Sequence, residues 1–137
     1  MGEGAEMRLF AKRMRRFLDR PFKKGGTGPG GYDCLGLVAA VQDKLGRRFP
    51  REYAGFSERD YWRLYEEDRE RAEQTMIEFF DSFAPRVDAR RLMPGDILVV
   101  RSLKNGWRFP AVYVGNGNCI TSLADLGTRI IALNDSL

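Results

Sequence analysis

The chain of 137 residues contains no histidine, and its only cysteines are Cys34 and Cys119. The absence of histidine removes the imidazole group that cysteine hydrolases use to generate the thiolate and to protonate the leaving group. Two cysteines do not make a disulfide framework, and we expect both thiols to be reduced. The sequence offers no metal-ligand motif, so we expect neither a metal ion nor another cofactor.

Long apolar runs are missing as well: no segment approaches the roughly 18–20 apolar residues of a membrane-spanning helix. The N-terminus begins with a charged amphipathic pattern and shows no secretory signal, so we expect synthesis in the cytoplasm. A hydrophobic fraction of 43% is ordinary for a globular protein. We therefore expect one domain over residues 1–137, with a flexible stretch over residues 1–6.

Positive charge is concentrated near the N-terminus, within a net charge of +4 and a pI of about 9.3. The basic residues of this segment are Arg8, Lys12, Arg13, Arg15, Arg16, Arg20, Lys23 and Lys24. A solvated helix face is the simpler interpretation, and a docking surface for an acidic protein or a nucleic acid is the alternative. Because no zinc knuckle, RNP motif or helix-turn-helix pattern accompanies the charge, we do not expect a nucleic-acid partner.

Apolar residues at helical spacing predict helices in the first two thirds of the chain. The first helix covers residues 9–18 and ends before Pro21, which opens a glycine-rich loop over residues 21–31. Asp33 is suited to cap a second helix, and Gly46 is suited to end it.

A helical insert is predicted over residues 47–93, between the second helix and the strands. Ser57-Glu58-Arg59-Asp60 resembles a capping box that opens a short helix through about Glu67. A further helix, marked by apolar residues at helical spacing, ends before Pro85.

From Pro94 onward the pattern changes to short apolar runs separated by the turn sequences Asn105-Gly106 and Gly115-Asn116-Gly117. The predicted strands lie at residues 97–100, 111–114, 118–122 and 128–133. Helices first and antiparallel strands afterwards define an α+β fold, with N-terminal helices packed on a small antiparallel sheet.

Cys34 stands at the start of the second predicted helix, after the approach Gly30-Gly31-Tyr32-Asp33. The dipole of a helix lowers the pKa of a thiol at its N-terminus. The backbone N–H groups at such a position can also stabilise an oxyanion, so the layout suits a nucleophile. The structural alternative is that Cys34 belongs to the apolar face of the helix and is core, as we also expect for Cys119.

Four segments resemble, in the same order, the motifs of the NlpC/P60 family of papain-like cysteine peptidases. They are residues 21–26, 33–37, 94–98 and 109–117, and the resemblance runs from about residue 8 to residue 133. It implies a papain-like fold and cleavage of peptide bonds in the bacterial cell wall, with a cysteine nucleophile, a histidine base and a third polar residue that orients the histidine. Leu35, where many members have serine, resembles the branch found in phage tails and gene-transfer agents.

The family motif places the nucleophile at Cys34 but places the histidine at Phe109. The third polar position falls on Thr121. The tyrosine that many members carry in the first segment falls on Phe22, which cannot donate a hydrogen bond. The resemblance therefore implies a catalytic site that has lost three of its four usual polar groups.

No other residue is an evident replacement for the missing base. A register shifted by one residue would place Arg108 or Pro110 at the histidine position, and neither can accept a proton. Asp33 is better suited to capping the helix, while Asp96 and Asp125 offer only carboxylates, a class of side chain that is weakly basic in model peptides. A carboxylate is a weak base for removing the proton of a thiol whose ordinary pKa is about 8.5.

Aromatic residues near the expected cleft are candidates for binding. The resemblance suggests a pocket lined by Phe22, Asp33, Trp107 and Tyr113 beside the former catalytic positions. The insert adds Tyr53, Phe56, Tyr61, Trp62 and Tyr65. Packing of the insert on the domain is the simpler interpretation, and a peptide- or sugar-binding rim is the alternative.

Three functions remain open from the sequence. The first is an inactive NlpC/P60-like domain that serves as a structural or adaptor component of a phage tail tip or tail-like particle, with protein partners in that assembly. The second is a cell-wall peptide hydrolase in which Cys34 works with an atypical base. The third is a non-catalytic domain that binds peptide or peptidoglycan in the old cleft.

Overall fold

The computed structural model describes residues 3–51 and 60–133, with side chains from Arg8 onward. Its helices are α1 (Glu3–Met14), α2 (Cys34–Lys44), α3 (Tyr61–Glu67) and α4 (Arg69–Phe83), with 3-10 turns η1 (Arg15–Phe17) and η2 (Ala89–Arg91). Its strands are β1 (Thr27–Gly28), β2 (Gly31–Tyr32), β3 (Ile97–Arg101), β4 (Arg108–Gly115), β5 (Asn118–Leu123) and β6 (Gly127–Ala132). This order of elements confirms the α+β prediction.

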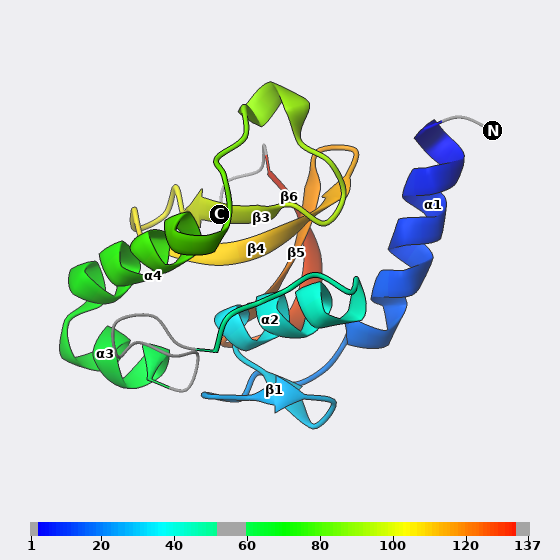
Figure 1. The fold of residues 1–137 in the computed structure, drawn as a ribbon. Helices are drawn as coiled ribbons and strands as arrows, with labels where there is room; N and C mark the ends of the chain where they lie inside the picture. The colour runs from blue at the N-terminus through cyan, green and yellow to red at the C-terminus, as the bar shows by residue number, and fades with distance from the viewer. Residues whose placement is uncertain (1–2, 52–59, 134–137) are drawn as a thin grey trace.

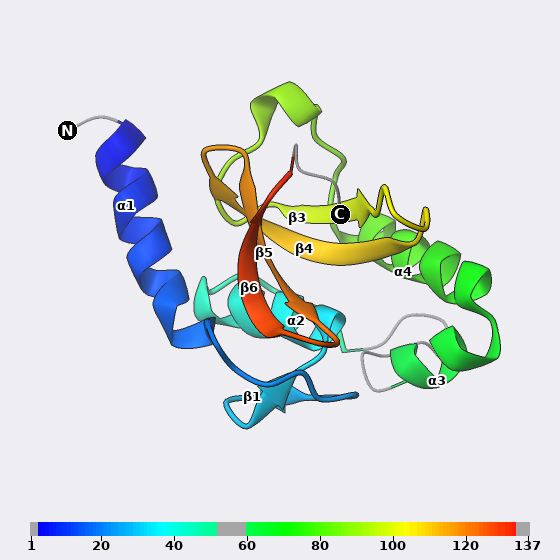
Figure 2. The same cartoon turned by 180° about the vertical axis from the view of Figure 1, so that it is seen from behind.

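Strands β3 to β6 form one antiparallel sheet in chain order, so that β3 and β6 are its edges. Figure 1 shows α2 beneath this sheet, the pair α3 and α4 at one end, and α1 standing apart at the other end. Figure 2 shows the same layout from behind, with β6 crossing in front of α2. Within the described residues, no helix is both long and apolar enough to cross a bilayer.

Helix α2 is defined by its cap, its apolar sides and its terminal glycine. Asp33 accepts a hydrogen bond from the Gly36 N–H at 2.6 Å, which satisfies a donor that the first turn leaves free. Leu37 and Val41 are fully buried in the main core. Gly46 follows the helix with a φ of +73°, a conformation that glycine adopts without steric cost. The predicted start and stop of α2 are confirmed.

Helices α3 and α4 pack on each other, and only one residue, Asp68, separates them in the chain. Asp68 caps α4 by accepting a hydrogen bond from the Arg71 N–H at 3.2 Å. α3 ends at Glu67 and α4 ends before Pro85, as the sequence predicts. The predicted capping box begins at Ser57, which lies outside the described residues.

Two segments differ from the sequence-based expectation near the N-terminus. Helix α1 already begins at Glu3, earlier than the predicted start. The glycine-rich segment 21–31, predicted as a loop, contains strand β1 and the first residue of β2, which pair antiparallel. Glycine spacing alone does not reveal such a two-residue ladder, because the same residues are typical of open loops.

Strand β4 begins at Arg108, three residues earlier than predicted, and therefore includes a proline. Pro110 lies opposite Val99 of β3. A proline lacks the N–H that a central strand usually needs, which is why the sequence predicted a later start. Pairing of β4 with β5 is recorded from Val112 onward, and beside Pro110 the hydroxyl of Thr121 donates to the proline carbonyl at 3.0 Å.

We expect Gly36→Ala to destabilise the fold strongly. A Cβ atom at this position would overlap the backbone carbonyl oxygen of Gly26, in the loop that packs on α2. Overpacking against backbone costs about 1–3 kcal/mol, and we expect the upper part of that range in urea unfolding. Gly28→Ala is the control, because no atom lies within 4 Å of its added Cβ. Equal free energies of unfolding for the two variants would contradict the close contact.

Candidate functional site

The start of α2 is fastened to the preceding loop by Asp33, which is fully buried. Its Oδ2 accepts a hydrogen bond from the Gly25 N–H at 2.8 Å, and its Oδ1 accepts the bond from the Gly36 N–H at 2.6 Å. A buried carboxylate persists only with such partners. Both oxygens are therefore engaged in structure, which fits the capping role predicted for Asp33.

Cys34, the first residue of α2, is only 6% exposed and belongs to the main core cluster. Burial, and secondly the nearby charge of Asp33, raise the pKa of its thiol to about 12. The backbone N–H groups of Leu35 and Cys34 and the side chain of Tyr61 act in the opposite direction and lower the pKa of the thiol, but by less. The position at the helix start was expected to lower the pKa; desolvation outweighs that effect.

Tyr61 is a buried side chain close to the thiol. It is 1% exposed, comes from the first turn of α3, and lowers the pKa of Cys34. Burial and the proximity of Cys34 and Tyr65 raise the pKa of Tyr61, so the phenol keeps its proton. Tyr65, one turn further along α3, has its pKa raised by burial and then by Glu73.

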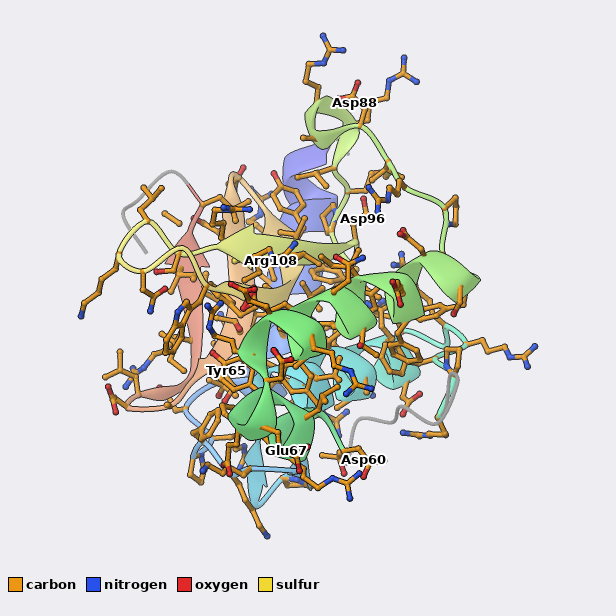
Figure 3. All side chains as sticks on the ribbon, turned by 90° about the vertical axis from the view of Figure 1, so that its left-hand side faces the viewer. Asp60, Tyr65, Glu67, Asp88, Asp96 and Arg108 are labelled. Carbon is orange, nitrogen blue, oxygen red and sulfur yellow. The ribbon has the colours of Figure 1, made fainter. Side chains whose placement is uncertain are left out.

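Glu73 of α4 is a buried carboxylate beside these tyrosines, with 2% of its side chain exposed. It accepts a hydrogen bond from Arg69 Nη1 at 2.7 Å and another from Arg108 Nε at 3.0 Å. The two arginine side chains are 30% and 27% exposed, respectively. Figure 3, which looks onto α3 and α4, shows Tyr65 and Arg108 on the side of the molecule where these helices lie. A charged cluster thus links α4 to the start of β4.

Alternate residues of β4 face opposite sides of the sheet. Val112 packs in the core with α2, and Arg108 shares its face and reaches Glu73 of α4. Phe109 pairs with Val100 of β3 and lies on the other face. Both neighbours considered for the histidine position, Arg108 and Pro110, alternate with Phe109 and therefore lie on the same face as Val112.

Two neighbouring residues of β5, Thr121 and Ser122, make hydrogen bonds through their hydroxyl groups. Thr121, the predicted third position, is fully buried and donates its hydroxyl to the carbonyl of Pro110 at 3.0 Å. Its neighbour Ser122 donates to the carbonyl of Tyr32 at 2.7 Å, two residues before Cys34. Ser122 therefore links β5 directly to the segment that carries the thiol, and the sequence analysis missed it.

Of the remaining predicted pocket residues, Phe22 and Trp107 contact the same aromatic group of α3, whereas Tyr113 bonds to the β4–β5 turn. Phe22 packs edge-on against Trp62, with ring centroids 5.3 Å apart. Trp107 is 43% exposed and stands edge-on to Tyr65 at 6.1 Å. Tyr113 lies at the β4–β5 turn, where its hydroxyl accepts a hydrogen bond from the Gly117 backbone at 3.0 Å.

Three of the five aromatic residues that the sequence analysis singled out in the insert lie within the described residues. Tyr61, Trp62 and Tyr65 pack against one another, with Trp62 and Tyr65 centroids 4.9 Å apart. This arrangement fits the packing interpretation for these three residues. Tyr53 and Phe56 lie outside the described residues.

The other carboxylates considered as bases serve local turns. Asp96 accepts a hydrogen bond from the Met93 N–H at 2.9 Å, just before β3. Asp125 is exposed in the turn between β5 and β6. Across residues 3–51 and 60–133, no group of three or more histidine, cysteine, aspartate or glutamate side chains is placed to hold a metal ion.

The sequence analysis identified neither Tyr61 as the neighbour of the thiol nor the pairing of Glu73 with Arg108. Glu73 carried the only available signal, since it precedes Met76 by three residues and Phe80 by seven, on a helix face that is otherwise apolar. A charged residue on a buried face requires an ionic partner. Its partner Arg108 is 35 residues away in the chain, and only the fold brings them together.

We expect Glu73→Gln to lower the free energy of unfolding by about 2–3 kcal/mol in urea titrations. The change leaves two partly exposed guanidinium groups without their carboxylate, and removal of one partner from a buried ion pair costs about 3–5 kcal/mol when burial is complete. Glu70→Gln is the matched control on the same helix, since Glu70 is 84% exposed and lies 3.8 Å from Arg69. We expect its effect to stay within about 0.5 kcal/mol; a loss as large as that of Glu73→Gln would show that burial is not decisive.

Comparison with known proteins agrees with this architecture. A search of curated protein sequences gives no match. The structure resembles the NlpC/p60 domain of the peptidoglycan hydrolase SagA, with a TM-score of 0.55 and 18% identity over 96% of this chain and 90% of that one. It also resembles an NlpC/P60 family protein from Bacillus cereus, with a TM-score of 0.61 and 22% identity over 94% of this chain and 35% of that one. The NlpC/P60 family profile matches residues 19–136, and the chain therefore belongs to the NlpC/P60 family.

Proposed function

We propose that this chain is a non-catalytic NlpC/P60 domain with a structural or adaptor role. The observation that carries the proposal is the state of Cys34: it is buried in the main core, and burial raises the pKa of its thiol to about 12. The thiolate is the nucleophile in cysteine hydrolases. With this pKa, a fraction on the order of 10⁻⁵ of the thiol is ionised at pH 7.

Among residues 3–51 and 60–133, we find no free base beside the thiol. The chain has no histidine. Asp33 is engaged by two backbone N–H groups, and Arg108 is paired with Glu73. General-base assistance is typically worth ~10²–10⁴ in rate, and its loss comes in addition to the cost of ionising a buried thiol.

We further propose that the assembly served by this domain is a phage tail tip or a tail-like particle. The support is the resemblance of the segment around Leu35 to the branch found in phage tails and gene-transfer agents. A domain of this kind would contribute its fold and surface rather than its chemistry. Tail particles can be purified and their proteins identified by mass spectrometry. If this chain is not among the proteins detected, the assignment is contradicted.

Alkylation of Cys34 by iodoacetamide tests the state of the thiol. In a Cys119→Ala background, we expect native protein at pH 8 to react about 1,000-fold more slowly than the same chain in 8 M urea, because ionisation of the native thiol is suppressed. The native rate should rise with pH up to the limit at which the fold remains intact. A native thiol that reacts faster than the unfolded one, with a midpoint below pH 8, would contradict the proposal.

Hydrolysis of peptidoglycan tests the function itself. We expect purified protein and its Cys34→Ala variant to release the same background of soluble muropeptides, measured by chromatography beside an active NlpC/P60 hydrolase. The comparison isolates any contribution of the thiol. Release at an enzymatic rate by the wild-type chain, abolished in Cys34→Ala, would overturn the proposal.

A further inference from the structure

A cavity of about 270 Å³ lies between η1, the β1–β2 hairpin and the C-terminal half of α2. Its apolar floor includes Phe17 and Tyr32, each 4% exposed. Ala40 of α2 also lines the cavity and is half-buried. This volume is below the ~300–1,000 Å³ of typical small-molecule sites and fits a single large apolar side chain.

The rim of the same cavity is cationic. Arg16, Arg20 and Lys44 line it, and all three are exposed. Within the described part of the chain, none of them forms an ion pair with a carboxylate. Elsewhere on the surface, exposed arginines such as Arg86 and Arg129 do have acidic partners. The cavity therefore has an apolar floor and a rim of three positive charges that no carboxylate of the described residues neutralises.

The positive region continues beyond the cavity. Lys12 and Arg13 are exposed in the last turn of α1, directly before η1 and next to Met14, which is buried in the core. Figure 1 shows the N-terminal end of α1 extending away from the rest of the fold. These two cations also form no ion pair among the described residues. Charge of one sign over a connected surface attracts an oppositely charged partner and accelerates encounter.

We propose that this cavity and its rim, formed by Arg16, Phe17, Arg20, Tyr32, Ala40 and Lys44, bind an acidic segment of a partner protein that inserts one apolar side chain. The apolar floor supplies the anchor, in the manner of an interface hot spot, and the cations pair with carboxylates on either side of the anchor. Nucleic acid is the less suitable partner, because a phosphate backbone fills the rim but leaves the apolar floor without a matching group.

This docking surface goes beyond the proposed function and does not depend on the loss of catalysis. From α2, the cavity is lined by Ala40 and Lys44 in the last two turns, and Cys34 is not among its lining residues. Binding and hydrolysis are measured separately, so a chain that cleaves peptidoglycan could still bind the acidic segment. Failure of one proposal therefore leaves the other testable.

Fluorescence anisotropy with the full chain tests the docking surface. The probe is a dye-labelled peptide of twelve glutamates and serines with one central leucine, and the matched probe carries alanine in place of leucine. We expect the leucine peptide to bind about tenfold more tightly, because burial of its side chain is realised only in the cavity. A dye-labelled single-stranded oligonucleotide of equal charge is the third probe.

Two variants separate the floor from the rim. Ala40→Met fills the cavity with a helix-compatible side chain, and we expect it to reduce the affinity for the leucine peptide to that for the alanine peptide. Arg16→Gln with Arg20→Gln should weaken both peptides about fivefold, given the modest worth of exposed charge pairs. Arg101→Gln with Lys104→Gln is the control, since it removes the same charge from the exposed β3–β4 hairpin; we expect it to change affinity less than twofold.

Three outcomes would overturn the proposal. One is equal binding of the leucine and alanine peptides, or no binding of either. Another is an Ala40→Met variant that binds the leucine peptide as the wild type does. The third is tighter binding of the oligonucleotide than of the leucine peptide, with a loss on Arg16→Gln and Arg20→Gln, which would identify the rim as a phosphate-binding surface instead. Circular dichroism of each variant confirms that the fold is retained.

Discussion

The two hydrogen bonds accepted by the buried carboxylate of Asp33 hold together the part of the molecule on which the site depends. One bond caps α2 through Gly36, and the other ties down the glycine-rich loop through Gly25. They place the loop against the first turn of α2 so closely that Gly36 has no room for a side chain beside Gly26. The thiol of Cys34 is therefore fixed in position by its neighbour in the sequence, and the charge of that neighbour raises its pKa.

Two opposing effects act on this thiol, and their magnitudes decide its state. Backbone N–H groups at the start of a helix favour a thiolate, as they do in reactive cysteines. Removal from water favours the neutral thiol and can shift a pKa by several units when burial is complete. Here α3 places Tyr61 over the sulfur, and desolvation prevails. The layout of a nucleophile and the chemistry of a core residue are thus found at the same position.

The sequence predicted the fold well where local signals and tertiary packing agree. The cap at Asp33, the stop at Gly46 and the change of period near Pro94 each have a local physical cause, and each appears in the structure. Pro110 shows the limit of such rules: proline disfavours a strand interior because it lacks an N–H, but β4 contains it opposite Val99 of β3, and the Thr121 hydroxyl donates to its carbonyl. These contacts join residues of three strands, so no local rule predicts them.

The site was less predictable because its contacts join residues that are distant in the chain. The cysteine was identifiable from its motif. The residues around it were not, since Glu73 meets Arg108 only when the insert folds onto the sheet. Motif alignment placed Phe109 at the histidine position, whereas pairing with β3 turns its side chain to the face opposite Val112. A difference of one residue in register reverses the face of every side chain in a strand.

The phenol of Tyr61 has a consequence for any attempt to restore catalysis in this scaffold. A histidine engineered into β4 would meet a sulfur that is buried beside this equally buried tyrosine. A peptide carbonyl could reach that sulfur only if the residues that bury it moved. Restoring hydrolysis would therefore require α3 to be redesigned so that the thiol becomes accessible, before a new proton acceptor could have an effect.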